Sequence, residues 1–173
     1  MKLKNCYLAL AVMCIVSSTS ALSQQKLGDL VAEGGFDWII GKWVASTDQG
    51  QPIQLVYKWE LDKHVVTAHF KMDNYESLGM IYLAAEDKIV QTGADNQGGT
   101  SKAVWEAMGD KAISKTESTR ADGQVNKMGI VQSKVDANTM KVEVYAIEST
   151  GKLADTPWAT LECKRKSQES EKP

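Results

Sequence analysis

Two histidines are the first residues in this chain of 173 that could do chemistry. His64 and His69 lie five positions apart in a run of alternating residues, and in a strand that odd spacing sends two side chains to opposite faces. The pair therefore cannot chelate one metal ion. A single histidine could still bind haem, or act as a base if folding brought it close to Asp95 or Glu106. We expect a solvated or hydrogen-bonded His69 instead, and the sequence predicts neither a metal site nor a cofactor.

The carboxylates and the last cysteine follow patterns that structure alone explains. Three glutamates, Glu106, Glu143 and Glu162, fall within expected strands, where alternation allows either face. Cys163 has no nearby histidine and no reactive motif, so it is expected to pack as a small residue. The aspartates stand mainly in expected turns, where side chains bond the backbone: Asp62, Asp73, Asp87, Asp110, Asp122 and Asp136. We predict no catalytic residue, and whether the protein is an enzyme stays open.

The first 23 residues have the three parts of an export signal. Lys2 and Lys4 precede an apolar run at 6–16, which is too short to span a bilayer, and small residues fill 17–23. A lipoprotein anchor at Cys14 is the alternative, although Met13 stands where such anchors need a small residue. We expect a periplasmic or secreted protein with no stable membrane insertion after removal of the signal.

The net charge and the length of the chain limit its expected partners and its number of domains. Loss of the two lysines in the signal takes the formal net charge from −2 to −4, and no basic stripe remains, so nucleic acid is not an expected partner. Residues 24–166 are long enough for one domain whose core needs no disulfide. Residues 167–173 carry no apolar side chain and are expected to be a disordered tail.

The elements that position these residues are nearly all strands. A short helix is expected within 24–35, stopped by two glycines, and after it the hydrophobic period becomes two. Asp122-Gly123 is the strongest hairpin signal and predicts a type I′ turn. Sequential hairpins predict an all-β fold, a single antiparallel up-and-down barrel of about 8–10 strands. One strand opens near Gly41, and the others are expected at 53–61, 64–72, 77–84, 88–94, 101–108, 111–120, 125–134, 139–147 and 158–166.

One octapeptide connects this pattern to a known family. Residues 36–43, Phe-Asp-Trp-Ile-Ile-Gly-Lys-Trp, resemble the opening of lipocalin-like barrels, where Gly-x-Trp begins the first strand after a short helical turn. In that family the tryptophan closes one end of the barrel under a basic residue of the last strand. The resemblance implies that Arg165 covers Trp43, and a guanidinium stacked on an indole contributes roughly 0.5–2 kcal/mol.

The remainder of the chain is similar to the lipocalin-like (calycin-type) β-barrel domains of uncharacterised exported bacterial proteins. The likeness covers most of 36–166 and is carried by a series of turn and strand residues: Asp95, Gly98-Gly99, Trp105, Gly109-Asp110 and Asp122-Gly123. It implies a barrel fold whose usual role is to enclose an apolar molecule.

Aromatic side chains on the strand faces are the expected ligand-binding residues. Inward positions of a barrel either fill the interior or line a cavity. We expect a small apolar or amphipathic ligand in the lumen, at the end opposite Trp43, bound by Tyr57, Trp59, Phe70, Tyr82 and Trp105. Two alternatives remain: an enzyme that uses a lumen carboxylate or His69 as acid or base, and an envelope interaction module or inhibitor with a filled barrel.

Overall fold

The computed structural model describes residues 25–85 and 88–166. The expected signal at 1–23 and the expected tail at 167–173 lie outside these residues.

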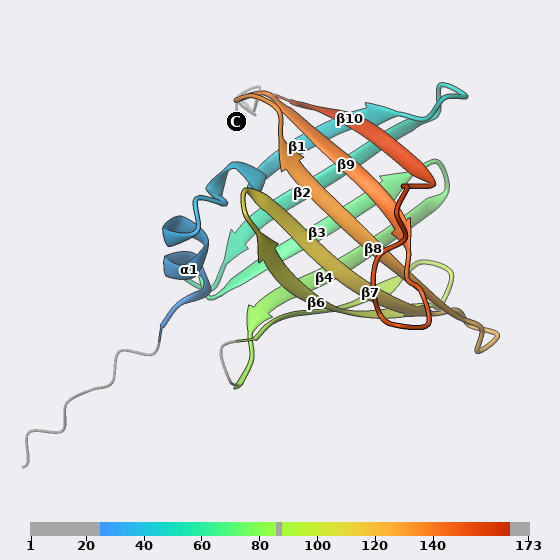
Figure 1. Ribbon diagram of the computed structural model, residues 1–173, viewed down its shortest axis with the longest axis horizontal. Coiled ribbons are helices and arrows are strands. Elements are labelled where there is room, and N and C mark those ends of the chain that lie inside the picture. The colour runs from blue at the N-terminus through green and yellow to red at the C-terminus, as the bar shows by residue number, and fades with distance from the viewer. Residues whose placement is uncertain (1–24, 86–87, 167–173) are drawn as a thin grey trace, which may run out of the picture.

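Ten strands form one closed antiparallel barrel in which each strand pairs with the next and the last pairs with the first (Figure 1). This confirms the predicted all-β, up-and-down architecture. The strands are β1 (Gly41–Ser46), β2 (Pro52–Glu60), β3 (Val65–Met72), β4 (Tyr75–Leu83), β5 (Ile89–Asp95), β6 (Thr100–Met108), β7 (Lys111–Thr119), β8 (Val125–Lys134), β9 (Thr139–Ala146) and β10 (Ala159–Arg165).

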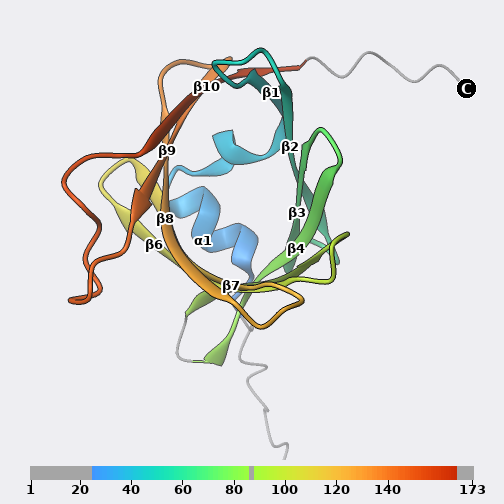
Figure 2. The same ribbon diagram turned by 90° about the vertical axis from the view of Figure 1, so that its right-hand side faces the viewer.

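A short helix lies at one end of the barrel. Helix α1 (Leu27–Glu33) ends where Gly34 donates its backbone N–H to the Leu30 carbonyl, as the glycine pair predicts. When the molecule is turned by 90°, so that the viewer looks into the ring of strands, α1 lies behind the ring (Figure 2). We call this the helix end; the turns after β2, β4, β6 and β8 lie there. The opposite, far end carries the connections after β1, β3, β5, β7 and β9.

The opening octapeptide is only half strand. Asp37–Ile39 form a 3₁₀ helix (η1), and β1 begins at Gly41, where φ is 136°. A side chain at Gly41 would collide with the Arg165 guanidinium, so the position requires glycine for space as well as for conformation.

The hairpin at Asp122-Gly123 forms, but the prediction of a type I′ turn is wrong. Such a turn needs positive φ at both central residues, and only Gly123 has it, at 85°. Gly123 instead donates its N–H to the Arg120 carbonyl, and Asp122 accepts the N–H of Gln124. The loop is long enough for a turn followed by one left-handed glycine, which leaves Asp122 unstrained.

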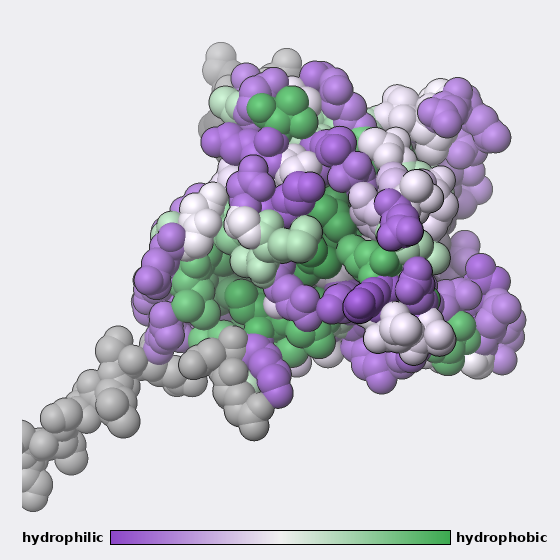
Figure 3. Space-filling view, in the orientation of Figure 1, coloured by the Kyte–Doolittle hydropathy of each residue, from purple (hydrophilic) through white to green (hydrophobic). Residues whose placement is uncertain are grey.

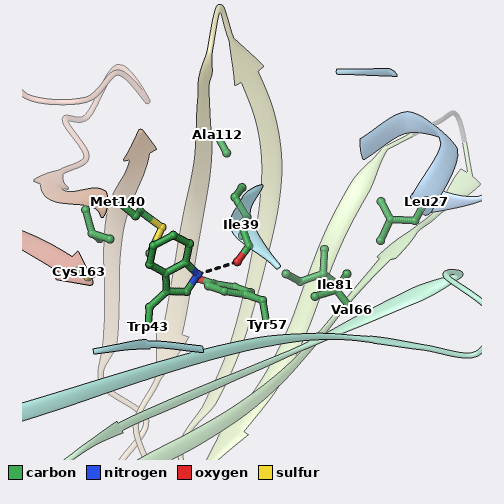
Figure 4. Close-up of a cluster of buried hydrophobic side chains, with 10 residues drawn as sticks. Leu27, Ile39, Trp43, Tyr57, Val66, Ile81, Ala112, Met140 and Cys163 are labelled. Atoms are coloured by element: carbon green, nitrogen blue, oxygen red, sulfur yellow. Dashed lines mark hydrogen bonds between the residues drawn. The ribbon is translucent and has the colours of Figure 1, made fainter. Parts of the chain in front are cut away.

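Strand register decides which side chains face inward. Leu55 lies opposite Phe70, Tyr57 opposite Ala68, and Trp59 opposite Val66, so the apolar stripes of β2 and β3 share the inner face. Continued around the ring, this register brings Ile81, Trp105 and Ala112 to the same face. The buried cluster gathers towards the helix end, with Trp43, Met140 and Cys163 on one side and Val66, Ile81 and Leu27 on the other (Figure 4).

The contact between the first and last strands is the shortest in the ring. It consists of Trp43 opposite Arg165 and Val44 opposite Lys164, whereas β1 pairs with β2 over its whole length. A groove of about 640 Å³ lies at this seam, lined by residues of β1, β2 and β10 and by Lys71 and Asp73.

Candidate functional site

Trp43 and Arg165 meet at the helix end. The Arg165 guanidinium carbon lies 4.1 Å from the centroid of the Trp43 ring. Its Nη1 donates to the Ile40 carbonyl at 2.8 Å and its Nη2 to the Trp38 carbonyl at 2.6 Å. Trp43 is 1% exposed, and its Nε1 donates to the Ile39 carbonyl at 2.8 Å. The arginine is therefore engaged by backbone carbonyls and an indole face, and holds the barrel end together.

A cavity of about 300 Å³ lies between α1 and the barrel wall. Apolar side chains gather on the surface where α1 meets the strands (Figure 3). Leu27, Leu30 and Val31 of α1 form one side, and the segment after the helix contributes Gly34, Phe36, Ile39 and Ile40. The barrel contributes Tyr57, Val66, Ile81, Ile89, Trp105, Glu106, Ala107 and Ala112.

This cavity lies at the same end as Trp43, not at the opposite end where we expected the ligand. Its lining has one charged residue, Glu106, which sits opposite Ile113 on the outer face of the strands and pairs with Lys115 at 3.2 Å. The space is therefore apolar, apart from the hydroxyl of Tyr57 and the indole N–H of Trp105.

Tyr57 is the polar group most deeply placed in the site. It is 5% exposed, and its hydroxyl accepts a hydrogen bond of 2.6 Å from Nε2 of Gln132. Gln132 is on β8, which is not a neighbour of β2, so this bond crosses the lumen. Burial raises the pKa of Tyr57 to about 12 and keeps the phenol neutral. The Gln132 Oε1 is buried with no hydrogen-bond partner among the described residues.

The five aromatic candidates are not all brought together. Tyr57 and Trp105 line the cavity, and Trp105 donates to Oε1 of Gln91 at 3.0 Å. Trp59 packs against the buried cluster but is outside the cavity lining. Phe70 is nearer the far end, edge-on to Tyr75 with the ring centroids 5.9 Å apart.

Tyr82 lies outside the barrel. It is in register with Val65 and Val90, and all three are on the outer face, whereas Ile81 and Leu83 on either side of it face inward. Sequence reasoning also missed Gln132 and the α1 side chains. For Gln132 a signal existed, because alternation along β8 places it on the same inward face as Ile130 and Met128.

The candidate acid–base groups lie apart from one another. His69 is on the outer face, where its Nε2 lies 2.6 Å from Oε1 of Glu76, as expected for a hydrogen-bonded histidine outside the lumen. Asp95 accepts the backbone N–H groups of Gln97 and Gly99, and these bonds keep its pKa below the ordinary value. His64 lies in the β2–β3 turn. The geometry gives no support to His69 as a base on an enclosed substrate.

No other reactive centre appears in the described part of the chain. Cys163 is fully buried, and burial raises its pKa to about 11, so it is a packed thiol and a poor nucleophile. Residues 25–85 and 88–166 contain no group of three or more His, Cys, Asp or Glu side chains able to hold a metal ion. Within the same ranges, no helix is long and apolar enough to cross a membrane.

The fold defines the class to which this chain can be assigned: a closed, ten-stranded, antiparallel up-and-down barrel, an architecture compatible with the lipocalin-like fold. Sequence comparison finds no protein-family model and no curated protein that matches the chain.

Proposed function

We propose that this protein binds a small, uncharged apolar or amphipathic molecule in the cavity between α1 and the barrel. The observation that carries the proposal is the chemistry of the lining. About 300 Å³ of space is bounded by aliphatic and aromatic side chains, with no cation and with the only carboxylate on the outer face.

The energetics of such a site favour neutral ligands. Removing apolar surface from water contributes about 25 cal/mol per Å², whereas burying an unpaired charge costs far more. The raised pKa of Tyr57 has the same cause, since its surroundings disfavour an anion. A fatty-acid carboxylate would therefore have no cation as partner here, while an uncharged group could accept a hydrogen bond from the Tyr57 hydroxyl, whose oxygen accepts the bond from Gln132.

The likeness to lipocalin-like domains of exported bacterial proteins and the pattern of residues 1–23 support one further element of this proposal. The protein acts outside the cytoplasm, in the periplasm or after secretion. Cell fractionation with amino-terminal sequencing of the mature chain tests this: a full-length cytoplasmic protein would contradict it.

Titration with N-phenyl-1-naphthylamine, a neutral probe that fluoresces in apolar surroundings, tests the binding site. Ala107→Phe places a bulky side chain in the lining, at an exposed inward position where little packing is disturbed. We expect saturable binding by the natural chain and at least a tenfold weaker Kd in the variant.

The matched control is Ala94→Phe, an exposed alanine on the outer face of β5. It should bind the probe as the natural chain does. Absence of saturable binding by folded protein, or equal affinity of the two phenylalanine variants, would refute binding in this cavity.

A further inference from the structure

The far half of the lumen is open to water. At the helix end, inward-facing residues such as Val66, Tyr57 and Gln132 are buried. Beyond the Tyr57–Gln132 bond, most inward-facing side chains are only half-buried, among them Leu55 and Met128 in the middle of their strands. A side chain that faces into a filled barrel would be shielded, so water must reach these positions through the far end, which Figure 2 views directly. We call this part of the lumen the far compartment.

One wall of the far compartment is lined with hydroxyl and amide groups. Ser101, Ser118 and Asn126 lie opposite one another on β6, β7 and β8, and Thr116 faces inward in the next row. All four are half-buried, and no side-chain hydrogen bond within the described residues engages any of them. Water reaches the polar atoms of these four side chains, since none of them is among the buried atoms without a partner. A ligand with hydroxyl groups can replace that water and keep the hydrogen bonds.

Two glycines extend this wall and widen it. Gly79 on β4 lies opposite Gly93 on β5, next to Ser101 in the same row. An added Cβ at Gly93 would stand 2.9 Å from Oγ of Ser101 and 2.8 Å from the Leu78 carbonyl. The absence of side chains here leaves the serine hydroxyl accessible from the lumen.

The wall formed by β2 and β3, across the lumen, is apolar, with Leu55 and Phe70 facing inward and half-buried. Val144 of β9, which pairs with β8, is a half-buried apolar side chain beside the polar wall. The compartment is thus two-faced, with hydrocarbon on one side and neutral hydrogen-bonding groups on the other.

Charge in the lumen is confined to its rims. The charged residues at inward strand positions are Asp95 at the far end and Lys134 and Arg165 at the helix end. Asp95 is satisfied by two backbone N–H groups and the Tyr75 hydroxyl, and Arg165 by carbonyl oxygens. Lys134 is exposed at the rim of the helix end, so the middle of the lumen carries no charged side chain among residues 25–85 and 88–166.

We propose that the far compartment is a second binding site, distinct from the helix-end cavity, for an uncharged molecule with hydroxyl groups on one part and hydrocarbon on another, such as an alkyl glycoside. Hydroxyl groups both donate and accept hydrogen bonds, as do the serine, threonine and asparagine side chains of the polar wall. The hydrocarbon part lies against Leu55 and Phe70, where its burial adds affinity.

Three probes with the same eight-carbon chain test the assignment by calorimetry below their micelle concentrations: n-octyl β-D-glucoside, octanoate and octyltrimethylammonium. We expect the glucoside to bind at least tenfold more tightly than either ion. Thr116→Val and Ser118→Ala each remove one hydroxyl and should weaken glucoside binding about threefold to tenfold, as expected for one lost hydrogen bond. Thr119→Val is the matched control, because Thr119 is on the same strand but faces outward.

Three results would overturn the proposal. The first is that octanoate or octyltrimethylammonium binds as tightly as the glucoside. The others are that Thr116→Val and Thr119→Val weaken glucoside binding equally, or that the folded natural chain does not bind the glucoside. Thermal unfolding of every variant verifies folding. The naphthylamine probe separates this proposal from the preceding one: Ala107→Phe should leave glucoside binding intact, and Thr116→Val should leave naphthylamine binding intact.

Discussion

The side chain of Arg165 makes all of its contacts with groups that hold the fold together. Its guanidinium donates to three carbonyl groups, those of Trp38, Ile40 and Ala137, and covers the Trp43 ring. Those carbonyls belong to the segment before β1 and to the β8–β9 turn, and the ring belongs to β1 itself. A single residue of the last strand thus contacts three separate parts of the helix end.

Replacing this residue should be costly. We predict that Arg165→Ala lowers the free energy of unfolding by roughly 2–4 kcal/mol, because charge-assisted hydrogen bonds and the stacking contact are lost together. Arg165→Lys keeps the charge without the planar fork and should recover less than half of that loss. Urea unfolding measures both. Arg120→Ala, at an exposed arginine bonded to Gln124, is the control and should stay within about 0.5 kcal/mol; an equal loss there would contradict the argument.

Single residues were predictable where alternation and chemistry agreed. The lipocalin-like resemblance implied that Arg165 covers Trp43, and alternation agreed, because Arg165 shares its strand face with Leu161 and Cys163. Tyr82 could not be placed, because β4 is apolar on both faces and alternation then gives no direction. The Tyr57–Gln132 bond joins residues 75 positions apart, and no local pattern predicts such a pair.

At the scale of elements, α1 is fixed to the barrel by an unusual turn. Leu61, Asp62 and Lys63 all have left-handed conformations, with φ of 48°, 51° and 65°. In residues with a Cβ atom, a left-handed backbone conformation costs about 1–2 kcal/mol per residue. The turn is held by contacts with the helix: Gly28 donates its N–H to the Lys63 carbonyl at 3.0 Å, and Nζ of Lys26 lies 2.5 Å from Asp62.

Gly28→Ala should separate these two elements. An added Cβ would stand 2.7 Å from the Cβ of Lys63, so the turn or the helix must move. We predict a loss of about 1–3 kcal/mol in unfolding free energy, faster amide exchange over Leu27–Glu33, and weaker naphthylamine binding. Hydrogen-exchange mass spectrometry gives the decisive comparison with Glu33→Ala, an exposed change in the same helix. Undiminished protection of α1 in Gly28→Ala would show that the contact does not hold it.

Elements were predicted better than the turns that join them. Period-two patterns and turn residues placed nine of the strands within about two residues of their observed bounds. Only the family resemblance implied a helical turn before Gly41, and no residue pattern placed it at Asp37–Ile39, because Ile39 and Trp38 adopt it to pack on the core and meet Arg165. The same applies to the turn type at Asp122, which depends on loop length as well as on residue preference.

For the whole molecule, two buried groups make stability depend on alkaline pH. Burial raises the pKa of Cys163 from 9.0 to about 11 and that of Tyr57 from 10.0 to about 12. In both cases the folded state holds its proton more tightly than the unfolded state. The contribution of these two protons to the free energy of unfolding is therefore fully present below pH 9, and it is lost as the pH rises towards 12.

We predict that the free energy of unfolding falls by roughly 2–3 kcal/mol between pH 8 and pH 10.5, mostly through Cys163. Cys163→Ala lowers stability at every pH because it leaves a small cavity, but it should flatten this slope. Urea unfolding at the two pH values provides the comparison. A slope unchanged by the substitution would mean that other groups control the alkaline transition.

The short seam between β1 and β10 has a consequence for how the protein is made. Every other strand finds its partner next to it in the chain, but this junction joins Ile40 to Arg165 across 125 positions. Until the last strand has been synthesised, the sheet has two bare edges, and unpaired edges are templates for joining another chain. Two residue pairs and one stacked arginine then remove both edges at once. Self-association of unfinished or transiently opened chains, by exchange of a terminal strand, is the hazard that this junction suppresses.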